Sequence, residues 1–183
     1  LSSQIPMMRL LQGDVGCGKT SVALVSSVVT MKKGYQVAIM CPTEALAHQH
    51  FNTFYTILKN TPYKISLLLG STKSKEKSNI LDQLKNNQVN LIIGTHSLIQ
   101  KNIQFYNLAL AIIDEQHKFG VGQRIELVNK NKGCNCLIMT ATPIPRSLRL
   151  TQFGDLDISS ITTTPKGRKG TQTKIIRPDI FQK

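Results

Sequence analysis

The sequence predicts an α/β fold with a mainly parallel sheet and helices on both faces of that sheet. Two observations favour this fold class. Short and almost uninterrupted apolar runs alternate with longer helical segments along the chain, which is typical of parallel strands covered on both sides. Each glycine-rich, acidic or threonine-containing motif also follows directly on such a run, and ligands of these sheets bind at the carboxyl ends of the strands.

The expected strands are short apolar runs that end at a glycine, a proline or a polar residue. In chain order they cover residues 7–11, 36–41, 64–69, 89–93, 108–113 and 136–139. The expected helices cover residues 19–31, 44–58 and 75–85. Gly34 ends the first helix and Thr43 is the N-cap of the second. The third helix is polar, with Ile80, Leu81 and Leu84 on its inner side.

Size and composition indicate one globular domain. The 183 residues are 40% hydrophobic and 18% charged, which fits a folded, soluble chain rather than a disordered one. The apolar runs are only strand-sized, so no transmembrane span is expected. The chain begins Leu1-Ser2-Ser3-Gln4, without an initiator Met or a signal-peptide pattern, and we expect it to be part of a longer protein.

The formal net charge of +13, from 23 basic and 10 acidic residues, predicts a polyanionic partner. Nucleic acid is the first candidate, and an anionic membrane surface comes well behind it. A lysine-rich genome composition is the alternative that requires no partner. Because aromatic residues make up only 5% of the chain and Trp is absent, we expect contacts to phosphates rather than base stacking.

The cysteines and two neighbouring histidines suggest no metal site. The chain contains no C-x-x-C spacing among its four cysteines, which are Cys17, Cys41, Cys134 and Cys136. Buried, reduced thiols in a cytoplasmic protein are therefore expected, with Cys134 and Cys136 on opposite faces of a strand. His48 and His50 lie two residues apart on a helix, point in different directions, and are interpreted as ordinary surface or partly buried side chains.

Residues 13–20 fit the pattern G-x-x-x-x-G-K-[ST] of a phosphate-binding loop. They read Gly13-Asp14-Val15-Gly16-Cys17-Gly18-Lys19-Thr20, between an apolar run and a helix. Glycines let backbone N–H groups surround phosphates at the N-terminus of the helix. Lys19 is expected to contact the β- and γ-phosphates of ATP, and the Thr20 hydroxyl to bind Mg²⁺. Cys17 is expected to contribute only its backbone N–H.

An acidic pair follows the apolar run at residues 108–113. We expect Asp114 to bind Mg²⁺, directly or through water, and Glu115 to polarise the attacking water as a general base. The alternative is a solvated acidic turn. Two carboxylates at the end of a strand, in a chain that already holds a phosphate-binding loop, favour the catalytic interpretation.

Five motifs together resemble the first motor domain of superfamily 2 helicases. They are the loop at residues 13–20, Pro42-Thr43-Glu44, Gly94-Thr95-His96, Asp114-Glu115-Gln116-His117 and Thr140-Ala141-Thr142. Within that superfamily, residues 93–100, 114–124, 139–146 and 153–169 are similar to phrases of the RecG family of ATP-dependent DNA helicases. Transcription-repair coupling factors share the phrase TATPIPR but typically have Glu in place of Gln116, which favours the RecG family. The resemblance covers essentially the whole chain.

The resemblance implies a RecA-like P-loop NTPase domain over residues 1–161. Residues 162–183 would then be a hinge and the start of a second motor domain, with a strand at residues 173–176. The implied activity is ATP hydrolysis coupled to unwinding of branched DNA, such as forks and Holliday junctions, in recombination and repair, by a cytoplasmic monomer. Alternatives are a translocase of the transcription-repair coupling type, an inactive nucleotide- or DNA-binding fragment, and, less favoured, a P-loop ATPase for transport or partitioning.

The resemblance also assigns residues to DNA. Thr43, and Thr95 with His96, would bind successive phosphates of one strand at two helix N-termini, independently of base sequence. Helix capping is the alternative for Thr43. Arg124 and Arg146 are further candidates for phosphate contact.

Four residues are implied to couple hydrolysis to movement. Gln116 and His117 would sense the γ-phosphate. The hydroxyls of Thr140 and Thr142 would switch partners between the acidic motif and the side that faces DNA. The simpler alternative for the two threonines is that their hydroxyls cap the end of a strand.

Overall fold

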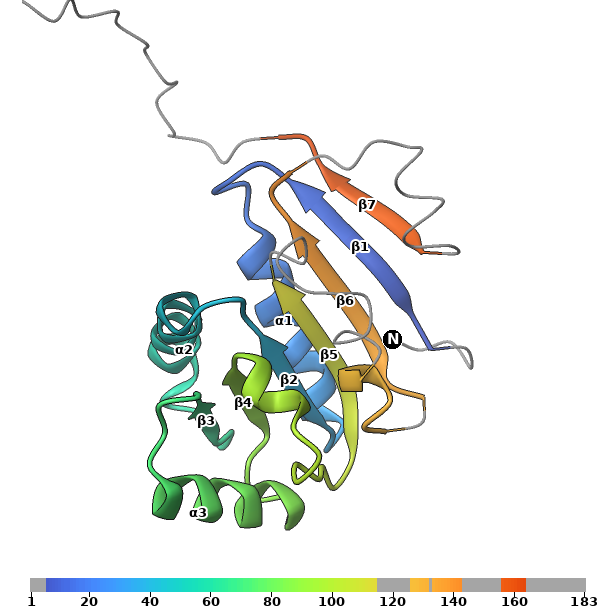
Figure 1. Ribbon diagram of the computed structural model, residues 1–183. Helices are drawn as coiled ribbons and strands as arrows, with labels where there is room; N and C mark the ends of the chain where they lie inside the picture. Colours follow the sequence, from blue (N-terminus) through green and yellow to red (C-terminus); the bar gives the residue numbers. More distant parts are fainter. Residues whose placement is uncertain (1–5, 115–125, 132, 143–155, 164–183) are drawn as a thin grey trace, which may run out of the picture.

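The computed structural model describes residues 6–114, 126–131, 133–142 and 156–163. These residues form a seven-stranded sheet in the order β3-β4-β2-β5-β6-β1-β7, and every neighbouring pair of strands is parallel (Figure 1). The strands are β1 (Met8–Gly13), β2 (Gln36–Met40), β3 (Ile65–Leu68), β4 (Leu91–Gly94), β5 (Leu108–Asp114), β6 (Asn135–Thr140) and β7 (Asp157–Ile161). The predicted parallel sheet is confirmed.

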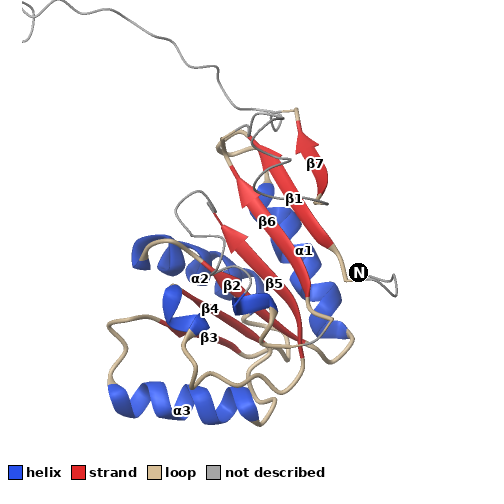
Figure 2. Ribbon diagram, turned by 45° about the vertical axis from the view of Figure 1, so that its right-hand side comes forward, coloured by secondary structure: helices blue, strands red, loops and turns tan. Residues whose placement is uncertain are grey.

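Helices cover both faces of this sheet (Figure 2), as predicted. They are α1 (Lys19–Lys32), α2 (Glu44–Leu58), α3 (Ser74–Lys85) and the short 3₁₀ helix η1 (His96–Ile99). Alternate residues of each strand point to opposite faces, so β2 contributes Val37 and Ile39 to one buried cluster and Ala38 and Met40 to the other. The first cluster contains side chains of α1 and α2, and the second contains side chains of α3 and η1.

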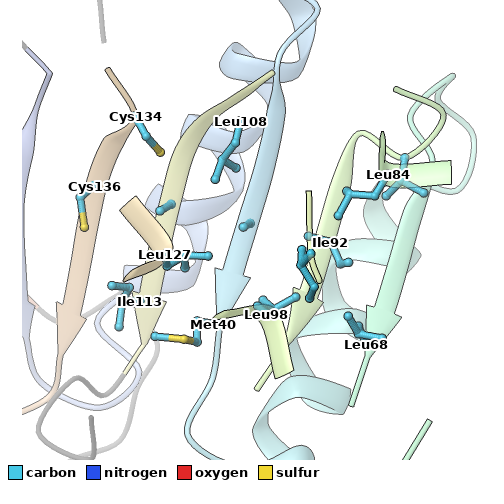
Figure 3. Close-up of a cluster of buried hydrophobic side chains, with 14 of the residues drawn as sticks. Met40, Leu68, Leu84, Ile92, Leu98, Leu108, Ile113, Leu127, Cys134 and Cys136 are labelled. Atoms are coloured by element: carbon cyan, nitrogen blue, oxygen red, sulfur yellow. The ribbon is translucent and has the colours of Figure 1, made fainter. Parts of the chain in front are cut away.

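The cluster under α3 and η1 shows how the strand pattern forms a core (Figure 3). Met40, Leu68 and Ile92 come from three neighbouring strands and are fully buried. Leu84 of α3 and Leu98 of η1 close over them. Ile80 and Leu84 are buried on the inner side of α3, as the sequence predicts, and Leu81 packs against the edge of the cluster.

The pattern of apolar residues predicts neither η1 nor β7, although the family resemblance implies a helix N-terminus at Thr95 and His96, where η1 begins. The expectation for two of the cysteines is wrong. η1 is only one turn long, and β7 is a partly exposed edge strand without a continuous apolar run. Cys134 and Cys136 were expected on opposite faces, but both pack into the same buried cluster, because residues two apart along an extended chain share a face. All four cysteines are buried, as predicted.

The carboxyl-terminal part of the domain prediction is untested. β7 ends at Ile161, and residues 164–183, which include the strand expected at 173–176, lie outside the described residues. Within the described ranges, none of the helices combines the length and apolarity needed to cross a membrane.

Candidate nucleotide-binding site

The predicted phosphate-binding loop connects the end of β1 to the start of α1. Gly16 and Gly18 have φ angles of 76° and 104°, a region that side chains with a Cβ rarely adopt. Gly18 is also the N-cap of α1, which directs the unpaired N–H groups of the first helical turn toward the loop. The glycines therefore permit the backbone path that a phosphate-binding loop requires.

Hydrogen bonds within the loop fix its shape. Lys19 Nζ donates to the carbonyl oxygens of Gly13 at 2.7 Å and Asp14 at 3.0 Å. The Val15 N–H donates to Asp14 Oδ1 at 2.8 Å. The backbone N–H of Cys17, which we expected to face phosphate, donates to the Asp14 carbonyl oxygen at 3.2 Å. A Cβ on Gly13 would lie 2.5 Å from the buried Cys17 Sγ, so this position tolerates only glycine without rearrangement.

Asp114 lies at the same edge of the sheet as the loop. It is the last residue of β5 and pairs with Met139 of β6, whose next residue, Thr140, pairs with Gln12 of β1. Because neighbouring strands are about 4.8 Å apart, β5 and β1 are separated by about 10 Å across β6. The loop and the acidic residue thus flank one strand end, as the sequence predicts. Glu115, Gln116 and His117 lie outside the described residues.

The chemistry of this edge fits ATP with Mg²⁺. Thr20 in the first turn of α1 and Asp114 each have a side-chain oxygen atom, and Mg²⁺ prefers oxygen ligands. The described residues contain no group of three or more His, Cys, Asp and Glu side chains that could hold a metal by themselves.

His50 is a site residue that the sequence reasoning missed. It is only 7% exposed, and its Nε2 lies 2.7 Å from Asp114 Oδ2. The expectation of a surface or partly buried side chain holds for His48, which is exposed, and is wrong for His50. The spacing of the buried residues of α2, at Ala47, His50 and Phe54, was the signal that could have placed His50 on the inner face.

Asp114 also influences a buried thiol at the end of the neighbouring strand. Burial raises the pKa of the Cys41 thiol far above its ordinary value, and the negative charge of Asp114 raises it further. Cys41 is fully buried and follows β2 directly. The acidic group therefore lies in a largely desolvated setting, with His50 on one side and a neutral thiol nearby.

The residues predicted to contact DNA are only partly brought together. Thr43 follows β2 and Thr95 follows the neighbouring β4, and the Cys41 N–H donates to the Gly94 carbonyl oxygen at 2.8 Å. The Thr43 hydroxyl caps α2 by accepting from the Leu46 N–H at 3.3 Å, so the capping alternative is realised. Arg124 and Arg146 lie outside the described residues.

Thr95 and His96 differ in exposure. Thr95 is 2% exposed, and its hydroxyl has no hydrogen-bond partner among the described residues. His96 is exposed and begins η1. Of the three described residues that the resemblance assigns to DNA, Thr43 and His96 therefore have exposed side chains and Thr95 does not.

A contact at this edge of the sheet joins α2 to the loop after β3. Glu44 accepts hydrogen bonds from the Ser71 hydroxyl at 2.8 Å and from the Ser71 N–H at 3.1 Å. These bonds, the hydroxyl first, lower the pKa of the Glu44 carboxyl below its ordinary value. The contact fixes the start of α2, and with it Thr43, relative to β3.

Thr140 and Thr142 contact one another. Thr140 is fully buried, and its Oγ1 lies 3.1 Å from Thr142 Oγ1 and accepts from the Thr142 N–H at 3.2 Å. Ala141 between them lines a cavity of about 300 Å³. The cavity is also lined by residues 12–14, where β1 leads into the phosphate-binding loop, and by residues 160–162 at the end of β7. In this structure the Thr140 hydroxyl caps the end of β6. Residues of the segment 140–142 and of the phosphate-binding loop line the same cavity.

Residues 5–151, which form most of the chain, match the DEAD/DEAH box helicase family. The chain belongs to this family. The motifs at residues 13–20 and 114–117 and the parallel sheet thus have a common explanation. The solved helicase domain of Hef from Pyrococcus furiosus, 22% identical with a TM-score of 0.67 over 85% of this chain and 35% of that one, shares the fold.

The RecG resemblance is also confirmed. The ATP-dependent DNA helicase RecG of Aquifex aeolicus is 51% identical over 96% of this chain and 22% of its own length, and that of Bacillus subtilis is 43% identical over 100% and 27%. A solved structure of RecG bound to a three-way DNA junction has a TM-score of 0.82 and 44% identity, over 98% of this chain and 24% of that one. The chain spans about a quarter of the length of the curated relatives it matches.

Proposed function

We propose that this chain is the first motor domain of an ATP-dependent DNA helicase that remodels forks and Holliday junctions in recombination and repair. The observation that carries the proposal is the match to RecG proteins at 43–51% identity over at least 94% of the chain. The position of the phosphate-binding loop and Asp114 on either side of β6 supports it. In this proposal residues 162–183 lead into a second motor domain.

The proposed ATP site is formed by residues on either side of the carboxyl end of β6. Residues 13–20 hold the phosphates, and Lys19 neutralises their charge. Thr20 and Asp114 hold Mg²⁺, which neutralises charge that develops on the phosphate oxygens. Glu115 polarises the attacking water as general base. Gln116 and His117 sense the γ-phosphate, and Thr140 and Thr142 transmit its loss.

The proposed DNA contacts are independent of base sequence. Thr43, Thr95 and His96 lie at the carboxyl ends of adjacent strands, where they would contact phosphates of one DNA strand. Arg124 and Arg146 add positive charge. The net charge of +13 favours such contacts. We further propose a monomer that acts in the cytoplasm, because the relatives it matches are bacterial proteins named for action on DNA.

The 183 residues alone should hydrolyse ATP barely above background, even with DNA. Phosphoryl transfer of this kind requires an arginine supplied from outside the phosphate-binding loop, which contributes about 10³- to 10⁵-fold in rate. In the proposed protein that arginine belongs to the second motor domain. Robust turnover by this chain alone would show that no such arginine is needed.

The deciding experiment uses the product of the complete reading frame that contains these residues. We expect it to separate the strands of a labelled four-way junction when ATP and Mg²⁺ are present. The Glu115→Gln variant should bind ATP with unchanged affinity and leave the junction intact. ATP-driven movement on duplex DNA without junction unwinding would favour a translocase of the transcription-repair coupling type. Nucleotide binding without turnover would leave only a binding module.

A further inference from the structure

We propose that His50 is a positioning residue of the nucleotide site, which orients the Asp114 carboxylate and thereby sets the affinity of the site for Mg²⁺. The inference rests on the proposed function, because it takes Asp114 as a Mg²⁺ ligand. The observation that carries it is the 2.7 Å contact between His50 Nε2 and Asp114 Oδ2, which joins residues 64 positions apart. Only 8% of the His50 side chain and 11% of the Asp114 side chain are exposed.

The fold holds the imidazole in one place. His50 lies on the buried stripe of α2, between Ala47 and Phe54, and its ring meets the Phe54 ring edge-on, with centroids 6.4 Å apart and planes at 66°. Phe54 is fully buried, so the ring of His50 packs against a fixed surface. The cap at Thr43 and the contact of Glu44 with Ser71 anchor the start of the same helix.

The topology explains why these two residues meet. β2 and β5 are neighbours in the sheet, and α2 begins a few residues after the carboxyl end of β2. α2 packs over β3 and β4, and the His50 side chain extends from it to Asp114 at the end of β5. A residue on the inner face of α2 at this level points at the Asp114 carboxylate, and that residue is His50.

The chemistry of the pair fits an orienting role. A carboxylate that binds Mg²⁺ is ionised and only accepts hydrogen bonds, so His50 Nε2 is the donor. A carboxylate has about four lone-pair sites, so a bond to Oδ2 is compatible with metal coordination. Mg²⁺ requires nearly ideal octahedral geometry, and a carboxylate that is free to rotate binds it less well. Loss of such an outer hydrogen-bond partner typically weakens metal binding by about 10- to 100-fold.

The test separates positioning from a purely structural role. In His50→Leu the new side chain is similar in volume to His but has no hydrogen-bond donor. In His50→Gln the amide N–H group can donate to Asp114 from nearly the same position as Nε2. His48→Leu is the matched control, because His48 lies on the same helix and is exposed. For each variant, the affinity for a fluorescent ATP analogue is measured as Mg²⁺ is raised and again in EDTA. Mn²⁺ binding in the presence of the nucleotide is followed by electron paramagnetic resonance.

We expect His50→Leu to need about 10- to 100-fold more Mg²⁺ for half-maximal nucleotide binding and to weaken Mn²⁺ binding equally. Its nucleotide affinity in EDTA should not change, and His50→Gln and His48→Leu should resemble the wild type. An unchanged metal requirement in a folded His50→Leu protein, or an equal loss of affinity in EDTA, would overturn the inference. If His50→Leu does not fold, His50→Asn, whose amide is too short to reach Asp114, replaces it. Absence of nucleotide binding by the wild type would instead overturn the proposed function, and this inference with it.

Discussion

Lys19 Nζ lies 2.7 Å from the carbonyl oxygen of Gly13, the residue at which β1 ends and the phosphate-binding loop begins. With the second bond, to the Asp14 carbonyl oxygen, the loop backbone itself holds the ammonium group over the loop. An ammonium has three N–H donors, so a donor beyond these two bonds can reach a phosphate oxygen. The lysine is thus placed by the loop before it contacts any ligand.

Replacing Lys19 tests this arrangement directly. Lys19→Ala removes a charge-assisted hydrogen bond of about 1.5–3 kcal/mol, so the dissociation constant for ATP should rise by about 10- to 150-fold. Fluorescence titration with an ATP analogue provides the measurement. Lys32→Ala, at the exposed far end of the same helix, should bind as the wild type does. Equal affinities for the wild type and Lys19→Ala would remove Lys19 from the site.

Gln36 should be a structural requirement, since its buried amide joins three parts of the chain. Its Nε2 donates to the carbonyl oxygens of Leu84 and Val89 at 2.8 and 2.9 Å, and its Oε1 accepts from the N–H groups of Tyr106 and Asn107. Gln36→Leu leaves buried backbone groups unpaired, at a cost of about 1–3 kcal/mol for each group.

Urea denaturation should therefore show a free energy of unfolding at least about 2 kcal/mol lower for Gln36→Leu than for the wild type. Gln88→Leu is the control, because Gln88 is exposed, and its effect should stay within about 0.5 kcal/mol. Similar unfolding curves for both variants would contradict the role of Gln36.

The ion pair at the edge of the sheet should contribute little. Arg9 of β1 contacts Asp157 of β7 at 2.9 Å, but the side chains are 37% and 68% exposed. Exposed pairs typically contribute about 0–1 kcal/mol and are screened by salt. Asp157→Asn should lower the free energy of unfolding by less than about 1 kcal/mol, and 1 M NaCl should remove most of the difference. A larger loss that persists in salt would show that the pair holds β7 in place.

Cys41 and Cys134 should resist thiol reagents in the folded protein. Burial raises the pKa of Cys134 from 9.0 to about 12, and burial and the charge of Asp114 raise the pKa of Cys41 further. Only the thiolate reacts, so mass spectrometry after iodoacetamide at pH 8 should show these two sites unlabelled. Both should react fully in urea. Rapid labelling without denaturant would mean that this part of the core opens readily.

The same thiols give the stability a pH dependence. Below pH 9 the thiols are mostly protonated in both states, so their pKa shift has no effect. As the pH rises from about 9 toward 12, the unfolded thiols ionise while the folded ones do not, so the free energy of unfolding falls. Cys134→Ala should make this fall shallower in urea titrations at pH 8 and pH 10. An unchanged slope would show that Cys134 does not contribute to it.

Elements with a strong local signal were predictable. The strand ending at Ile113 is a continuous apolar run, and the helix starting after Thr43 has both a capping residue and an inner stripe. η1 could not be predicted from periodicity, because a single turn has no period, and only the family resemblance implied a helix N-terminus at Thr95 and His96. β7 was missed because an edge strand needs no apolar run. Its pairing with β1 depends on contacts to residues nearly 150 positions away.

The positions of the loop from Gly13 to Thr20 and of Asp114 at one edge of the sheet could be predicted from the sequence, because each follows directly on an apolar strand. Their roles toward phosphate and Mg²⁺ stay predictions. Which groups surround the Asp114 carboxylate depended on strand order. β2 and β5 are neighbours in the sheet, although 67 residues lie between Met40 and Leu108. No local sequence pattern encodes that pairing. Only the folded sheet places His50 of α2 against Asp114 at the end of β5, because packing rather than local sequence decides which distant segments share an edge.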